Sequence, residues 1–311
     1  MVKGVAKRRD PDYQGHIKRS ASSKVFDVLN IVILTFLAMV TLYPFIYIIS
    51  FSISDVNAVL KNEVWLFPVG FSYSAYDLVF RGEELVTSYM NTFWYTGVGT
   101  ALNVLVTIAA AYPLSRQNYS VRGPLMIYFS ITMFFSGGLV PTYILVNQLG
   151  LYDSRWAIVL PGILSVWNLV IARVFFTANI PQEMTEAARI DGAGEFIIFF
   201  RIALPLSKAI IAILILYYAV GHWNNFFSPL IYLKSSDKFP MSLYLRKVLM
   251  TGVKIEAESV PDMYTDTIQN RAILEQLKHA VIVVTMLPII MAYPFLQKYF
   301  VKGVMVGALK G

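Results

Sequence analysis

Six long stretches of this sequence carry almost no charged side chain, and they constrain the fold more than any other feature. They are the residues between Asp27 and Asp55, 92–114, the residues between Arg122 and Asp153, 156–181, the residues between Lys208 and Lys234, and those between Lys278 and Lys298. Only Arg173 interrupts the fourth. About 20 apolar residues span a bilayer as a helix, and each stretch is near or above that length. Backbone that meets lipid must pair its polar groups internally, so we predict an all-α polytopic membrane protein with six transmembrane helices.

Composition supports lipid as a second solvent. Hydrophobic residues make up 57% of the chain and charged residues 14%. A typical soluble domain has about 45–50% apolar residues and about 25% charged residues. This imbalance excludes disorder, a coiled coil and an ordinary soluble enzyme. The chain has no Cys, which excludes disulfides, thiolate catalysis and cysteine metal sites.

The distribution of Lys and Arg predicts the orientation. Seven basic residues and only two acidic ones lie before Asp27, while the segment between the first and second stretches has five acidic and two basic residues. Arg116 and Arg122 follow the second stretch, and the C-terminal tail is basic. Cytoplasmic segments carry the excess of Lys and Arg, so we expect both termini in the cytoplasm. The net charge of +7 then reports topology rather than nucleic-acid binding. The first stretch is also too long for the apolar region of a signal peptide, so we expect it to stay in the membrane.

These signals predict three parts. Residues 1–25 form a basic cytoplasmic segment, residues 26–302 form the membrane domain, and residues 303–311 form a cytoplasmic tail. Two segments of the membrane domain are too long to be simple turns: an extracytoplasmic loop at 234–278 and a cytoplasmic loop at 179–208. In the first, apolar residues from Pro240 to Leu249 suggest a short amphipathic helix.

The predicted cytoplasmic loop contains residues that favour the start and the end of a helix. Pro181 suits the first turn of a helix, and Glu183 favours the positive end of that helix. Gly192 and Gly194 are expected to stop it, after which a second short helix runs from Glu195 to the re-entry of the chain into the membrane.

Small side chains, at Ala187 and Ala188, lie in the first of these helices between the charged residues Glu186, Arg189 and Asp191. Such a surface would let the backbone of another protein approach closely. A plain amphipathic connector, which needs no partner, explains the same residues equally well.

Seven fixed positions in this loop resemble the EAA loop of ABC importer permeases: Glu186, Ala187, Ala188, Gly192, Ile202, Leu204 and Pro205. Nearly the whole chain resembles the maltose-permease-like subunits of carbohydrate importers. Less specific motifs at 135–143, 221–225 and 302–311 resemble the branch that imports complex oligosaccharides.

The resemblance implies a type I importer permease in a bacterial or archaeal cytoplasmic membrane, forming half of a translocation pathway for oligosaccharides. The EAA residues, with Asp191, would form a coupling helix seated on a separate ATPase subunit. The implied partners are a second homologous permease, two ATPase subunits, an extracytoplasmic solute-binding protein that contacts the 234–278 loop, and membrane lipid. The sequence has no Gly-x-x-x-x-Gly-Lys-[Ser/Thr] phosphate loop, so ATP and Mg²⁺ would bind to the ATPase subunits. We therefore expect a chain without enzymatic activity and without a cofactor of its own.

Polar and aromatic residues within the spans are candidates for the substrate path. Trp167 and Asn168 are expected near the middle of span four, and four consecutive residues in span five: His222, Trp223, Asn224 and Asn225. Polar residues in a membrane usually face a cavity or another helix, so hydrogen bonding between helices is the alternative for each. His222 has no second ligand at metal-binding spacing.

Three further residues carry predictions about the placement of a side chain and the shape of a helix. Arg173, near the cytoplasmic end of span four, is expected to extend to the interface. Gly137 and Gly138, before Pro141, either bend span three or allow close helix packing.

Two other classes of membrane protein fit the residues of the six stretches less well. An ion-driven secondary carrier would be expected to hold a carboxylate within a span, yet the interiors of all six stretches lack Asp and Glu. An intramembrane enzyme would need a catalytic pair or a His-Glu-x-x-His motif, and the spans contain neither. Among importers, a non-sugar solute such as an amino acid, phosphate or a polyamine stays open, because an EAA loop does not distinguish substrates.

Overall fold

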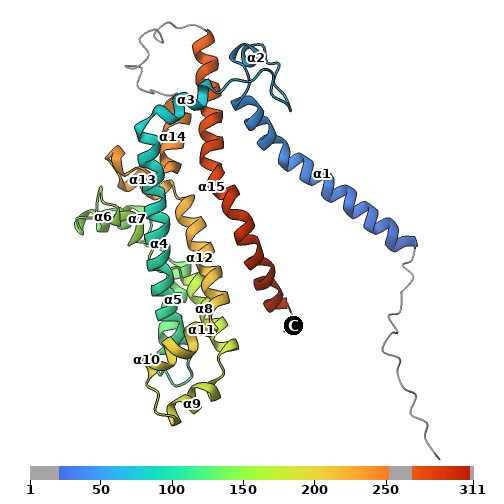
Figure 1. Cartoon of the computed structure of the whole chain (residues 1–311). Coiled ribbons are helices and arrows are strands. Elements are labelled where there is room, and N and C mark those ends of the chain that lie inside the picture. Colours follow the sequence, from blue (N-terminus) through green and yellow to red (C-terminus); the bar gives the residue numbers. More distant parts are fainter. Residues whose placement is uncertain (1–20, 252–267, 309–311) are drawn as a thin grey trace, which may run out of the picture. The chain divides into compact units, whose positions relative to one another are not determined.

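The computed structural model describes residues 21–251 and 268–308, and all its regular elements there are helical (Figure 1). The chain divides into two compact units, residues 1–47 and 48–311. The described part of the first unit is one helical segment of α1 whose side chains are exposed almost throughout. All other elements belong to the second unit.

The elements follow one another in this order: α1 (Ala21–Ser52), α2 (Val56–Leu60), α3 (Ser74–Arg81), α4 (Glu83–Ser115), α5 (Arg122–Phe134), α6 (Leu139–Gln148), α7 (Trp156–Val159), α8 (Val166–Asn179), α9 (Gln182–Ile190), α10 (Glu195–Ile197), the π-helix η1 (Ile198–Ala203), α11 (Leu204–Leu206), α12 (Lys208–Trp223), α13 (Phe227–Tyr232), the 3₁₀-helix η2 (Ser236–Lys238), α14 (Met241–Thr251) and α15 (Ile268–Ala308).

The six charge-free stretches all coincide with helices, which confirms the predicted all-α membrane fold. Within α1, α4 and α15, the segments Ser22–Ser52, Glu83–Ser115 and Ala272–Met291 are long and apolar enough to cross a bilayer without a break. The remaining stretches are interrupted or short. The α5–α6 pair bends by 112°, the helical segment 195–206 meets α12 at 77°, and α8 is an apolar helix of 14 residues.

The break in span three lies where the glycines predicted it. Gly138 precedes α6 with φ of +87°, a left-handed conformation that favours glycine. Pro141 then lies in the first turn of α6, where its missing N–H is not needed. The expected bend at this glycine pair is confirmed.

Span four is also interrupted, which the sequence analysis did not predict. Helix α7 ends at Val159, and α8 begins at Val166 after a segment that contains Pro161 and Gly162. The Ser165 Oγ atom accepts a hydrogen bond from the Asn168 N–H at 3.4 Å and so caps the start of α8.

Helix α4 is the central element of the second unit, because three hydrophobic clusters contain its residues. One cluster joins its C-terminal half to α8, η1 and α12, and includes Leu169, Phe176 and Leu214, which are fully buried. A second joins its N-terminal end to α3, α14 and α15. A third joins Tyr95 of α4 to α6, α7 and α13. Helix α14 begins directly after Pro240, which confirms the predicted short helix.

Candidate functional site

The loop at 179–208 folds into a corner between two helices. Helix α9 ends at Ile190, and Gly192 turns the chain with φ of +83°. Arg189 and Glu195 close this turn with an ion pair of 2.8 Å between Nη2 and Oε1. Because both backbone and side chains bridge the turn, α9 and α10 are held at a fixed angle.

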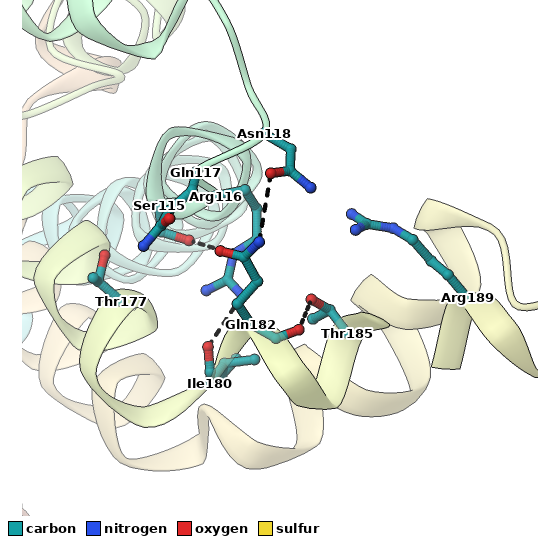
Figure 2. Close-up of a pocket in the computed structure, with 9 residues that line it drawn as sticks. All are labelled: Ser115, Arg116, Gln117, Asn118, Thr177, Ile180, Gln182, Thr185 and Arg189. Atoms are coloured by element: carbon teal, nitrogen blue, oxygen red, sulfur yellow. Dashed lines mark hydrogen bonds between the residues drawn. The ribbon is translucent and has the colours of Figure 1, made fainter. Parts of the chain in front are cut away.

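A small polar pocket of about 60 Å³ lies where α9 meets the ends of α4 and α8 (Figure 2). It is lined by Ser115, Arg116, Gln117, Asn118, Thr177, Ile180, Gln182, Thr185 and Arg189. A water molecule in the liquid occupies about 30 Å³, so this pocket is too small for a sugar. Its walls connect the ends of α4 and α8 to α9.

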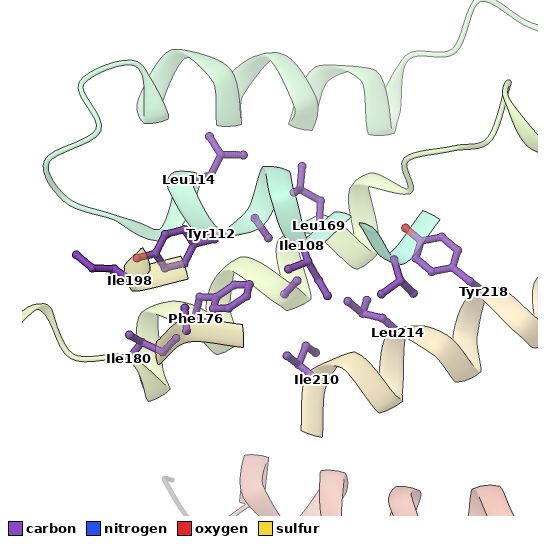
Figure 3. Close-up of a cluster of buried hydrophobic side chains, with 14 residues drawn as sticks. Ile108, Tyr112, Leu114, Leu169, Phe176, Ile180, Ile198, Ile210, Leu214 and Tyr218 are labelled. Atoms are coloured by element: carbon purple, nitrogen blue, oxygen red, sulfur yellow. The ribbon is translucent and has the colours of Figure 1, made fainter. Parts of the chain in front are cut away.

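The EAA residues divide into an outer and an inner group. Glu186, Ala187, Asp191 and Gly192 are exposed. Ile202 and Leu204 pack against the cluster of α4, α8 and α12, beside Ile198, which is fully buried near Tyr112 (Figure 3). Ala188 also contacts this cluster, and Pro205 is exposed at the start of the last helical turn. The loop therefore presents one surface outward and anchors the other in the core.

Two exposed apolar residues flank the Gly192 turn and were missed by the sequence analysis. Ile190 is 87% exposed and Phe196 is 81% exposed. No other large hydrophobic residue in the described part of the chain is as exposed as these two. Apolar residues beside a glycine turn, in a loop predicted to lie outside lipid, were the signal that could have identified them.

The candidate path residues of span four lie beside its break, near the middle of the 156–181 stretch. Trp167 and Asn168 occupy the first turn of α8, since this helix begins at Val166. Trp167 is 60% exposed, while Asn168 is buried. The span is interrupted beside them instead of running through as one helix.

His222 has a partner inside the protein. Its Nε2 atom lies 2.7 Å from Oδ1 of Asn103 on α4. The Asn103 Nδ2 atom in turn donates to the carbonyl oxygens of Gly162 and Ile163, each at 2.8 Å, in the unwound part of span four. Trp223 packs edge-on against Phe93, with 5.5 Å between ring centroids. Both residues join helices to each other.

Asn224 and Asn225 lie between α12 and α13, where the predicted span five is interrupted. Asn224 caps α12, and its side chain donates to the Val220 carbonyl at 3.1 Å. Asn225 accepts hydrogen bonds from Ser228 and Ser242, so it fixes the chain that follows. Of the six candidates, Trp167 and Asn224 are the exposed ones. A role in the substrate path stays a prediction for all six.

Known proteins with similar sequences and structures are transport proteins. The chain is 40% identical over 291 residues to Protein LplC of Bacillus subtilis (strain 168), covering 93% of this chain and 96% of that protein. It is 37% identical over 289 residues to the polygalacturonan/rhamnogalacturonan transport system permease protein YtcP of the same organism, covering 93% and 99%.

A solved bacterial ABC transporter involved in the import of the acidic polysaccharide alginate contains a chain that superimposes with a TM-score of 0.83 at 32% identity, covering 91% of this chain and 99% of that one. None of the protein-family profiles compared with the sequence matches it. The relatives nonetheless match over almost their full lengths, and the apolar helices agree with a protein embedded in the bilayer. The chain therefore belongs to the integral-membrane permease subunits of carbohydrate-type ABC importers.

Proposed function

We propose that this chain forms half of the translocation pathway of a binding-protein-dependent oligosaccharide importer, and that α9 couples this pathway to ATP hydrolysis on separate subunits. The observation that carries the coupling role is the division of the loop into two groups. The exposed group offers Glu186 and Ala187 to a partner, while Ile202 and Leu204 anchor the loop to the membrane core.

The exposed apolar residues indicate what covers α9. Ile190 and Phe196 lie in a loop that the charge pattern assigns to the cytoplasm, away from the lipid that would otherwise cover them. Large apolar residues exposed to water are characteristic of surfaces that bind another protein. An ATPase subunit with a cleft that receives α9 would bury both.

The loop is built to transmit a displacement without absorbing it. The Arg189–Glu195 ion pair bridges the turn, and helical structure runs from Glu195 to Leu206 before α12 begins. Closure of two ATPase subunits would move α9, and the continuous backbone would carry that movement into α8 and α12. Packed elements transmit such displacements because interiors are dense and poorly compressible.

The remaining parts of the proposal follow from the family and the charge pattern. A second homologous permease supplies the other half of the pathway, two ATPase subunits bind ATP and Mg²⁺, and a solute-binding protein delivers substrate to the opposite face. Residues 1–25, 303–311 and the coupling loop at 179–208 then lie in the cytoplasm, and the 234–278 loop faces the binding protein. Of that loop, residues 252–267 lie outside the described residues.

Acidic oligosaccharides are the first substrates to test. One relative is named for polygalacturonan and rhamnogalacturonan transport, and the solved transporter is described as importing an acidic polysaccharide. The six charge-free stretches have no Asp or Glu in their interiors, so these spans would place no carboxylate near an anionic sugar. Electrostatic repulsion along the path would then be low.

The deciding experiment is purification of the tagged chain from its native membrane, with the co-purifying proteins identified by mass spectrometry. We expect a second six-helix permease and an ATPase, and a co-purifying binding protein whose ligand can be assayed directly. Ile190→Asp should lose the ATPase, while the control Phe67→Asp, which changes a residue 79% exposed in another loop, should retain it. Recovery of the chain alone, in a detergent that keeps known complexes intact, would reject the coupling role and favour an ion-driven carrier.

A further inference from the structure

Two arginines exchange hydrogen bonds between the C-terminal ends of α4 and α8. Arg116 directly follows α4 and donates from Nη2 to the Phe176 carbonyl at 3.0 Å and from Nη1 to the Ile180 carbonyl at 3.1 Å. Arg173 of α8 donates from Nε to the Leu114 carbonyl, at the end of α4, at 3.1 Å. The sequence predicts that Arg173 extends to the interface, and the structure shows it turned toward α4 instead. Each arginine therefore satisfies carbonyls of the other helix.

The carbonyls involved lie at or just beyond helix ends, where donors within the helix run out, although Phe176 also accepts from the Ile180 N–H at 3.1 Å. The last four carbonyl oxygens of a helix have no partner within it, and the helix dipole makes this end favourable for a cation. Arg116 is 8% exposed, and it also donates from Nε to the Ser115 Oγ atom at 3.0 Å and lies 5.2 Å from the Tyr112 ring. A guanidinium group directs its N–H groups in a fixed plane, so these contacts hold Arg116 in one orientation.

This junction lies directly beside α9. Ile180, whose carbonyl Arg116 holds, is followed by Pro181, and α9 begins at the next residue. The first residue of α9, Gln182, also donates to Asn118 in the turn after α4 at 3.5 Å (Figure 2). The start of α9 is thus tied to the ends of both α4 and α8, while its other end continues through the Gly192 turn toward α12.

We propose that Arg116 and Arg173 are positioning residues for energy coupling: they join α4 and α8 into one block, so that a displacement of α9 moves both helices together. This inference rests on the coupling role proposed for α9. Without the two arginines, apolar packing and the Gln182–Asn118 hydrogen bond would still join the ends of α4 and α8, but less firmly. Part of the ATP would then be hydrolysed without a matching movement of the pathway.

The test uses the whole importer in proteoliposomes with its binding protein, and measures sugar imported per ATP hydrolysed. Arg116→Lys keeps the positive charge but cannot reproduce the planar fork that reaches two carbonyls, and we expect this ratio to fall about tenfold, the effect of losing roughly one charge-assisted hydrogen bond. Arg173→Lys replaces a single observed contact and should reduce the ratio less. A merely structural role would lower import and ATP hydrolysis together and leave the ratio unchanged.

Arg155→Lys is the matched control. Arg155 also ties elements together, donating from Nη2 to Asn91 Oδ1 at 2.8 Å and lying 5.6 Å from the Trp94 ring. These contacts are with the N-terminal half of α4, and not with the ends of α4 and α8 beside α9. Its variant should lower import and ATP hydrolysis in proportion. A wild-type ratio in Arg116→Lys would overturn the proposal.

A second measurement tests the proposal even if the Arg116→Lys importer assembles too poorly for transport assays. The chain has no Cys, so spin labels on cysteines introduced at the exposed Ser120 and Glu183 report the distance between the turn after α4 and helix α9. Arg116→Lys should broaden this distance distribution in the purified complex, and an unchanged distribution would overturn the proposal. Loss of the ATPase from the wild-type complex, or its retention in Ile190→Asp, would instead reject the coupling role of α9 itself.

Discussion

The Nε2 atom of His222 is a hydrogen-bond donor to Asn103. The Asn103 Nδ2 atom donates to the carbonyl oxygens of Gly162 and Ile163, so its other side-chain atom, Oδ1, is the one that faces His222 at 2.7 Å. The carbonyl oxygen of an amide can only accept a hydrogen bond, which places a hydrogen on Nε2 of His222. Three elements, α4, α12 and the unwound part of span four, thus meet at one amide group.

His222→Gln should preserve this junction, and His222→Leu should destabilise it. Gln retains an N–H donor for Asn103 Oδ1, whereas Leu leaves that buried oxygen without a partner, which costs about 1–3 kcal/mol. Thermal unfolding of the purified importer measures the difference. Equal unfolding temperatures for the two variants, with altered sugar uptake in both, would support a role in the substrate path rather than in packing.

Gly99→Ala should disturb the same junction from α4, the helix that faces His222. A methyl group on Gly99 would lie 2.5 Å from His222 Nε2, which forces the imidazole to move. Overpacking of this kind costs about 1–3 kcal/mol. Gly97→Ala is the control in the same helix, because a methyl group there meets nothing within 4 Å. A stability for Gly99→Ala equal to that of Gly97→Ala would contradict the close contact.

Asp153→Asn should destabilise the connection between spans three and four. Hydrogen bonds from the Ser235 side chain and backbone, then from the Lys234 backbone and the Lys238 ammonium group, hold the pKa of the Asp153 carboxyl well below its usual range. Asn tolerates the left-handed backbone at this position, where φ is 55°, so the substitution isolates the charge. The expected loss at neutral pH is about 1–3 kcal/mol.

The effect of Asp153 depends on pH in one direction. Because its pKa is depressed in the folded state, the stabilisation is complete above the unfolded value of about 3.9 and is lost as pH falls below it. Unfolding temperatures of wild-type and Asp153→Asn importers should therefore differ by a constant amount from about pH 8 to about pH 5 and converge in more acidic buffer. A difference that persists unchanged in acid would contradict this assignment.

Gly192→Pro should abolish uptake and leave membrane insertion intact. Proline fixes φ near about −65°, whereas this turn requires +83°. Gly192→Ala should impair uptake less, through backbone strain of about 1–2 kcal/mol. Gly194→Ala is the control, because Gly194 has φ of −75° and a methyl group there meets nothing within 4 Å. Unchanged transport by Gly192→Pro would reject the coupling role of the loop.

Replacing Trp167 or Asn224 by Ala should change the rate or the substrate range of uptake without changing stability, since both side chains are exposed. Trp223→Ala is the comparison, because Trp223 packs against Phe93 and its loss should lower the unfolding temperature instead. Uptake kinetics with sugars of different length separate these outcomes. Wild-type kinetics for both exposed variants would remove them from the path.

The all-α, membrane-embedded class of the chain could be predicted from the sequence because charge-free length reports directly whether a segment can enter lipid. The break in span four could not be predicted this way. Its unwound carbonyls at Gly162 and Ile163 are tolerated because Asn103, about 60 residues earlier in the chain, supplies their donors. Hydrophobic length carries no information about such a distant partner.

The 179–208 loop shows the same limit. Its EAA positions have fixed local spacing and could be recognised, and Gly192 could be assigned to a turn. Arg116 could not be connected to the loop, because its carbonyl partners lie 60 and 64 residues away. From the sequence, its basic charge indicates only membrane orientation.

The π-helical turn at Ile198–Ala203 makes the number of residues in the loop as constrained as their identity. Ile202 lies in this turn and packs into the core, while Gly192 lies at the outer corner. One inserted or deleted residue between them would rotate Ile202 by about 100° around the helix axis and move it out of the core. We therefore expect evolution to vary the exposed side chains between Gly192 and Ile202 but to exclude single-residue insertions and deletions from this segment.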